Sequence, residues 1–300
     1  MNDFIVHAGD DLQAAFDRAP EGAILHLTAG EYRRKAVIRT KGLTLVGEGA
    51  ERTVLVWDDY AEKIHADGKA YNTFRTWTLA VCADGVTLRG LSVVNDALHP
   101  ESKGQEVALS VYGDRFVMED CTLRSTQDTL FVGPLPRDLI ARYDGFLPDE
   151  LRADRPLSQR FTRCRIEGTV DFIFGCGDAR FEDCDIRSLR DARNVGYVAA
   201  PAHAPEQAEG FLFRRCRFTA EDGVRGVYLA RPWRDYGLAR FEDCVLGAHI
   251  APEGFDKWND TDRDKTARFY ETPPVPGRVP WCNRWQKASQ SFAPAGAKGT

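Results

Sequence analysis

The hexapeptides FTRCRI (residues 161–166) and FEDCDI (residues 181–186) contain the main clue to the fold. Both follow the pattern apolar-x-x-Cys-x-apolar, and about 20 residues separate their cysteines. The pattern recurs at residues 118–123, 213–218 and 241–246, and residues 88–93 (LRGLSV) repeat it with Leu in place of Cys. A short motif that recurs along the chain is typical of repeat proteins, in which each repeat is one structural unit.

Each copy alternates apolar and polar positions, as a short β-strand does. A single copy could not bury its apolar face, but stacked copies would bury a continuous interior. Leucine-rich repeats have similar periods, but their Leu/Asn framework is missing. We therefore predict an all-β, right-handed parallel β-helix. No linker interrupts the repeat between residues 86 and 246, so we expect a single domain over 1–300 with its core at about 4–285.

Both ends of the solenoid carry expected features. Asp10 and Asp11 are suited to cap a short helix over residues 12–19, which Pro20 would end and which would cover the open end of the coils. Strands are expected at residues 4–7, 24–27, 36–38, 43–46 and 54–57. After residue 246 we expect an aromatic-rich tail that packs along the outside of the solenoid, with residues 293–300 frayed.

Five of the eight cysteines occupy the same position of the repeat. We expect them to stack in the interior as reduced, small apolar side chains. No Cys-x-x-Cys pair occurs, and the six histidines are scattered without metalloprotease spacing. The pattern therefore favours no metal and no cofactor.

Composition narrows the range of partners. The formal charge is −5 and the isoelectric point about 5.8, and no basic stripe is present, so nucleic acid is not an expected partner. No stretch of about 18 apolar residues could span a membrane. We expect a monomer, cytoplasmic if Met1 is the native start and secreted if a leader was removed.

Two aspartates occupy the same position in the sequence relative to the repeated motif. Asp128 and Asp171 each lie seven residues after a motif cysteine, Cys121 and Cys164. If these cysteines occupy equivalent places in consecutive coils, the two carboxyls lie on neighbouring strands about 4.8 Å apart, and their pKa values should separate. Such a pair can supply acid, base or nucleophilic chemistry. The alternative is that each Asp binds local backbone amides, as we expect for Asp191, which has the same offset from Cys184.

Other candidate side chains are found near this pair in the sequence. Gln127 adjoins Asp128, and Gln105 lies about one coil earlier; such amide donors suit a developing oxyanion, or they could satisfy loop backbone. Arg231 could hold a carboxylate in its ionised form. Phe174 and Trp233 could stack on a sugar ring or pack in the core.

Several of these residues fall in a recognisable ordered set. The segments are QEVAL (105–109), QDTL (127–130), GTVDFIFG (168–175), LARPW (229–233) and RVPW (278–281), with a weaker TFRT at 73–76. In this order the set resembles the pectin methylesterases, the pectinesterase family of carbohydrate esterases. The resemblance covers residues 25–281 and implies a parallel β-helix.

The resemblance also implies roles for individual residues. Asp171 would attack the methyl-ester carbonyl of a galacturonate unit, and Asp128 would protonate the departing methanol and then activate water. Gln105 and Gln127 would stabilise the oxyanion, and Arg231 would pair with Asp171. The residues by themselves do not distinguish which aspartate attacks.

The same resemblance implies a substrate groove lined by Phe174, Trp233 and Thr76. The substrate would be methyl-esterified galacturonan, hydrolysed to methanol and free carboxylate without cofactor or metal. Residues 133–159 form an excursion that is longer than in plant members. It would be either a functional rim of the groove or surface decoration.

Three alternative functions remain open at this stage. A β-helix lyase or glycosidase would cut the polymer backbone. A non-catalytic β-helix would bind galacturonan and release nothing, and a related esterase or thioesterase would act on a different acyl group. Methanol release at constant polymer length distinguishes a methylesterase from all three.

Overall fold

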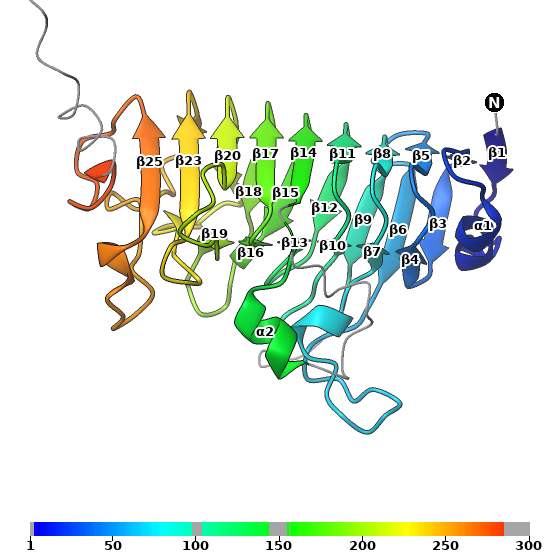
Figure 1. Ribbon diagram of the computed structural model, residues 1–300. Helices are drawn as coiled ribbons and strands as arrows, with labels where there is room; N and C mark the ends of the chain where they lie inside the picture. Colours follow the sequence, from blue (N-terminus) through cyan, green and yellow to red (C-terminus); the bar gives the residue numbers. More distant parts are fainter. Residues whose placement is uncertain (1–2, 98–103, 144–154, 156, 285–300) are drawn as a thin grey trace, which may run out of the picture.

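The computed structural model describes residues 3–97, 104–143, 155 and 157–284. Three parallel sheets run along the chain and form the three walls of a β-helix, with strands of successive coils lying side by side (Figure 1). Most coils contribute one strand to each wall, so strand n of a sheet pairs with the strand three places later in most of the chain. The predicted parallel β-helix is confirmed.

We call the ten-stranded wall sheet A. Its strands, in spatial order, are β1 (Asp3–Val6), β2 (Ile24–Leu27), β5 (Thr44–Gly47), β8 (Thr87–Arg89), β11 (Phe116–Glu119), β14 (Ser158–Thr162), β17 (Asp178–Glu182), β20 (Phe211–Arg214), β23 (Leu238–Glu242) and β25 (Arg268–Thr272).

Sheet B has eight strands and follows sheet A around each coil. In spatial order they are β24 (Val245–Leu246), β21 (Arg217–Ala220), β18 (Asp185–Ser188), β15 (Arg165–Gly168), β12 (Thr122–Arg124), β9 (Ser92–Asn95), β6 (Thr53–Trp57) and β3 (Gly30–Arg33).

Sheet C has seven strands and carries the candidate site. They are β22 (Tyr228–Ala230), β19 (Tyr197–Pro201), β16 (Val170–Gly175), β13 (Leu130–Val132), β10 (Leu109–Val111), β7 (Leu79–Val81) and β4 (Ala36–Ile38). The short helices of the described chain are α1 (Leu12–Arg18), α2 (Arg137–Arg142), η1 (Thr73–Arg75) and η3 (Arg263–Lys265).

The first residue of the repeat builds a ladder of aromatic rings inside the solenoid. Pairing of the sheet A strands places Phe161, Phe181, Phe213 and Phe241 opposite one another in successive coils. Their rings stack almost in parallel with centroids 4.9, 4.6 and 4.9 Å apart. All four are buried. The aromatic ladder fixes the register between coils because a slip of one residue would move every Phe out of the interior.

The corner between sheets A and B explains the polar residues of the repeat. The residue before each motif cysteine has a left-handed backbone, with φ between 51° and 54° at Asp120, Arg163, Asp183, Arg215 and Asp243. In the Leu-containing copy this residue is Gly90, with φ of 60°. Such a turn directs the cysteine that follows into the interior.

The cysteine prediction agrees with the structure. All eight cysteines are free, and Cys121, Cys164, Cys184 and Cys216 are buried in the motif position. Cys121 and Cys164 occupy equivalent positions in adjacent coils, because the residues that follow them, Thr122 and Arg165, pair in sheet B. Burial and the neighbouring Cys164 raise the pKa of the Cys121 thiol far above its usual range, as expected for a packing residue rather than a reactive one.

The predicted N-terminal helix is α1, over Leu12–Arg18. The Asp11 side chain caps it by accepting a hydrogen bond from the Ala14 backbone N–H, and Leu12 and Phe16 are buried. Figure 1 shows α1 beside the first coil. No helix in the described part of the chain is long and apolar enough to cross a membrane.

The early strands that we expect are present as β1, β2, β4, β5 and β6, so coils begin at β1. These coils lack the cysteine motif because they use Leu and Val in place of Phe and Cys. One expectation about the end of the solenoid needs correction. Part of the aromatic tail does not pack along the outside: Phe269 lies on β25 inside the last coil, where its ring centroid is 5.5 Å from that of Trp281. Trp258 does lie on the outer side, next to Arg231. Trp285 and residues 293–300 fall outside the described residues.

The aromatic ladder gives a stability prediction. Replacing Phe213 with Ala should lower the free energy of unfolding by about 3–5 kcal/mol, because the ring is fully buried between two stacked rings. Urea unfolding followed by circular dichroism measures this loss. Phe4→Ala is the matched control, since Phe4 is 45% exposed, and should cost far less. Equal losses of unfolding free energy in the two variants would contradict a stabilising role for the aromatic ladder.

Candidate active site

The register between coils brings the two predicted aspartates together on sheet C. Leu130 pairs with Ile173, so Asp128 and Asp171, each two residues earlier, occupy equivalent places in adjacent coils. The Asp128 backbone N–H donates to the Val170 carbonyl at 3.0 Å. Both aspartates have left-handed backbones, with φ of 66° and 51°. Asp is one of the few residues that tolerate this conformation, which turns both carboxyls out of the ladder.

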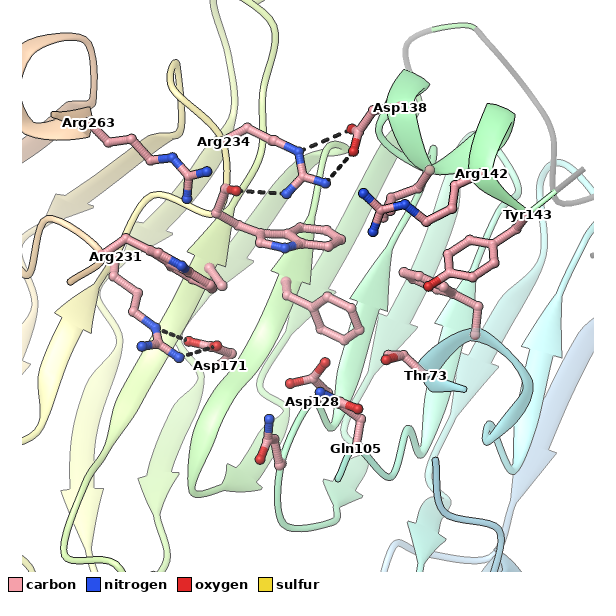
Figure 2. Close-up of a pocket in the computed structure, with 17 residues that line it drawn as sticks. Thr73, Gln105, Asp128, Asp138, Arg142, Tyr143, Asp171, Arg231, Arg234 and Arg263 are labelled. Atoms are coloured by element: carbon pink, nitrogen blue, oxygen red, sulfur yellow. Dashed lines mark hydrogen bonds and ion pairs between the residues drawn. The ribbon is translucent and has the colours of Figure 1, made fainter. Parts of the chain in front are cut away.

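Both carboxyls line a cleft of about 560 Å³ on the outer side of sheet C, a size typical of ligand sites. Figure 2 shows its labelled side chains converging from several loops. The lining residues are Thr73, Phe74, Gln105, Gln127, Asp128, Asp138, Leu139, Arg142, Tyr143, Asp171, Phe174, Ala200, Arg231, Trp233, Arg234, Trp258 and Arg263.

The predicted ion pair between Arg231 and Asp171 is present (Figure 2). Arg231 Nε donates to Asp171 Oδ1 at 2.8 Å and Nη2 donates to Oδ2 at 2.6 Å, a bidentate arrangement. The guanidinium also lies over two rings, 3.8 Å from the Tyr197 centroid and 4.1 Å from the Trp258 centroid. These contacts hold the charged form of Asp171 and fix its orientation.

The two carboxyls differ in their proton affinity. Burial raises the pKa of Asp128 well above its ordinary value, and the negative charge of Asp171 raises it further. Burial also raises the pKa of Asp171, but the hydrogen bonds and charge of Arg231 oppose this. Among the described residues, Arg231 donates hydrogen bonds to Asp171 and acts on Asp128 through its charge alone, so a proton shared by the pair resides on Asp128. The cleft therefore holds one carboxylic acid next to one carboxylate.

Gln105 and Gln127 both line the cleft beside Asp128. Arg193 Nη2 donates to Gln127 Oε1 at 3.3 Å, which turns the amide NH₂ group of Gln127 away from Arg193. Asp191 in turn binds Arg193 with both carboxylate oxygens, at 2.9 and 2.8 Å, and accepts from its backbone N–H at 2.7 Å. Asp191 thus binds local backbone as expected, and it also holds Arg193 next to Gln127.

The predicted aromatic residues are in the cleft, but one predicted contact is wrong. Phe174 and Trp233 line the cleft with ring centroids 5.7 Å apart. Thr76 is fully buried, donates to the Thr73 carbonyl at 2.8 Å and accepts from the Val107 backbone N–H at 2.9 Å. The hydroxyl of Thr76 therefore supports the cleft floor, and Thr73, three residues earlier on η1, lines the cleft instead.

Several lining residues were not identified from the sequence. Trp258 and Arg263 belong to the segment between β24 and β25, which was assigned to a tail. Asp138, Leu139 and Arg142 belong to α2, within the excursion that we expect to be either a rim of the groove or surface decoration; their place in the cleft favours the rim. An Asp or Arg in a loop has no periodic pattern, so only the fold reveals which of them reach the cleft.

The fold and the cleft together define a class: a parallel β-helix protein with a pair of unlike carboxyls in a lateral groove. The pectinesterase family model matches residues 6–135 and 149–279, and the chain belongs to this family. Pectinesterase QRT1 of Arabidopsis thaliana is 30% identical over 90% of this chain and 68% of its own length. Probable pectinesterase/pectinesterase inhibitor 35 of the same plant is 30% identical over 89% of this chain.

Among solved structures, pectin methylesterase from carrot has a TM-score of 0.76 and 25% sequence identity, covering 92% of this chain and 85% of its own. The chain spans only 46% of the length of the pectinesterase/pectinesterase inhibitor 35 relative. The family assignment therefore applies to the β-helix, and not to the remaining length of that relative.

The proton distribution in the cleft gives a second prediction. In Asp171→Asn the pKa of Asp128 should fall, because the neighbouring negative charge is removed and Arg231 loses its counter-ion. Carbon-13 NMR of the aspartate carboxyls across a pH titration measures this shift. Asp120→Asn, on the exposed corner, should leave the titration of Asp128 unchanged. An Asp128 that titrates identically in wild type and Asp171→Asn would contradict the proposed pairing of charges.

Proposed function

We propose that the chain is a pectin methylesterase, which hydrolyses methyl esters of galacturonate units in pectin or oligogalacturonides and releases methanol. Membership of the pectinesterase family supports this proposal. The observation that carries it is the unlike carboxyl pair in an open cleft, one acid at Asp128 and one arginine-bound carboxylate at Asp171. Ester hydrolysis with a covalent intermediate needs both forms at once.

In the first half of the reaction, Asp171 is the nucleophile because Arg231 keeps it ionised. A carboxylate oxygen of Asp171 forms a bond to the ester carbonyl carbon, and the carbonyl oxygen becomes an oxyanion. The amide NH₂ groups of Gln105 and Gln127 donate hydrogen bonds to it. Asp128 gives its proton to the methoxy oxygen as the carbon–oxygen bond breaks, so methanol leaves and an acyl-enzyme anhydride remains.

In the second half, Asp128 is a carboxylate and acts as general base. It takes a proton from water, whose oxygen attacks the galacturonyl carbonyl of the anhydride. The bond to Asp171 breaks and Asp171 departs as a carboxylate, stabilised by Arg231. Asp128 is protonated again, and the product forms as a carboxylic acid that gives its proton to the solvent and becomes a carboxylate. The site returns to its starting state.

The same cleft suits a sugar polymer. Phe174, Trp233 and Trp258 line it with aromatic surface, and such side chains commonly stack on the apolar faces of sugar rings. Polar and charged groups surround these rings, as in sites that bind hydroxylated ligands. Of the two compartments left open by the sequence, we favour secretion, since methylated galacturonan is a polymer of plant cell walls.

Replacing either aspartate tests the proposed roles. Asp171→Ala and Asp128→Ala should each lower kcat for methanol release from methylated pectin by at least about 10³-fold, because the nucleophile or the acid is lost. Asp120→Ala is a matched control: Asp120 has the same left-handed backbone, with φ of 53°, but its side chain is exposed. It should retain wild-type turnover. Normal turnover in either cleft variant, or shortening of the polymer by the wild type, would overturn the assignment.

Replacing Arg231 with Lys tests the orientation of the nucleophile. We expect about a 10- to 100-fold loss of kcat, because a lysine provides a point charge instead of the planar fork that binds both oxygens of Asp171. Arg215→Lys is the control, since Arg215 makes an equivalent bidentate pair with Asp183 on the exposed corner. Equal rates in the two variants would argue against a direct role for Arg231.

A further inference from the structure

Helix α2 lies outside the part of the chain that the family model matches. The pectinesterase family model matches residues 6–135 and 149–279, which leaves out residues 136–148 and with them α2. Figure 1 shows α2 projecting from the side of the solenoid, below the strands of sheet C. Four of the cleft's lining residues, Asp138, Leu139, Arg142 and Tyr143, come from α2 and the residue that follows it. A wall of the cleft is therefore made of residues that the family model does not include.

This wall is fixed to the rest of the cleft. Arg234 donates to both carboxylate oxygens of Asp138, at 3.1 and 2.7 Å. Leu139 is 3% exposed and packs in the apolar cluster that contains Phe74. Tyr143 donates its hydroxyl proton to Asn72 Oδ1 at 3.1 Å. Because α2 is held at both ends and by its buried face, the side chains it directs at the cleft have a defined position.

Of the arginines that line the cleft, all but one have a carboxylate partner in an ion pair within the described part of the chain. Arg231 is paired with Asp171, Arg234 with Asp138 and Arg263 with Asp235. Arg234 binds both oxygens of Asp138, so Arg142, one turn later, acts on this carboxylate through its charge and without a hydrogen bond. Among the described residues, the Arg142 guanidinium has no hydrogen-bond or ion-pair partner. It is exposed and directed into the cleft beside Asp138, opposite Arg231 (Figure 2).

We propose that Arg142 is a specificity residue that binds the free carboxylate of a de-esterified galacturonate unit near the unit being hydrolysed. This inference rests on the proposed methylesterase function. A methyl ester is neutral, whereas a de-esterified unit carries a negative charge on two oxygens that match the planar fork of arginine. The enzyme would thus favour partly de-esterified substrate over fully methylated substrate.

The size of the preference follows from the position of Arg142. An exposed ion pair contributes little compared with a buried one, and salt screens it. We therefore expect a preference of about 3- to 10-fold in kcat/KM, which decreases with rising ionic strength. Because Arg142 contacts a neighbouring unit and not the reacting ester, the preference should be found in KM rather than in kcat.

The experiment compares wild type with Arg142→Gln and Arg160→Gln. Arg160 is exposed on sheet A and does not line the cleft, so its replacement removes the same charge elsewhere. Methanol release is measured on a fully methyl-esterified oligogalacturonate and on a partly de-esterified oligomer of equal length. Arg142→Gln should lose about 3- to 10-fold in kcat/KM on the partly de-esterified oligomer and less than about twofold on the fully esterified one. Arg160→Gln should behave as wild type on both.

A binding measurement separates this proposal from the esterase proposal. Calorimetry with a fully de-esterified oligogalacturonate should show weaker binding to Arg142→Gln than to wild type or Arg160→Gln, whether or not methanol is released. Equal affinities in the three proteins, or equal losses of Arg142→Gln on the two esterified substrates, would overturn the role of Arg142. A wild type that releases no methanol but binds the oligomer through Arg142 would overturn the esterase function alone.

Discussion

The register between consecutive coils is the constraint on which the site depends. Stacked Phe rings and buried cysteines hold each coil in one position relative to the next, since a slip by one residue would expose the whole apolar set. Asp128 and Asp171 are superposed only because this register continues from sheet B through the turn into sheet C. The cleft chemistry is therefore a consequence of core packing, and no loop needs to bring the two carboxyls together.

Two superposed aspartates would be equivalent without a third group. Arg231 removes the equivalence, because its fork binds both oxygens of Asp171 while Asp128 is left in a buried setting beside a negative charge. Burial raises the pKa of both, and the charge of Arg231 opposes this at both, but only Asp171 also accepts the hydrogen bonds of Arg231. This answers a question that the sequence left open. In the function that we propose, Asp171 is the carboxylate and Asp128 is the acid, because only Asp171 accepts the bidentate hydrogen bonds of Arg231.

Regular features of the fold were accessible from the sequence and irregular ones were not. The hexapeptide repeat predicted the solenoid, and the equal offset of Asp128 and Asp171 predicted their superposition, because both depend on a repeated spacing. Thr76 was assigned to the groove from a short motif match, but η1 directs Thr73 outward and buries Thr76. Trp258 and Arg263 reach the cleft from a segment without a repeat, so no spacing in the sequence could predict their position.

The same distinction between repeated and unrepeated segments decides which parts of the solenoid can change in sequence and length. Residues on the strands of sheet C are tied to the coil register, so a change in their spacing would misplace the carboxyl pair. The excursion between β13 and β14 has no such constraint, because both of its ends are fixed by the ladder while its length is free. An added helix such as α2 can therefore bring a cation to the cleft without moving Asp128 or Asp171. In the roles that we propose, selection among substrates changes through Arg142 while the two aspartates remain in place.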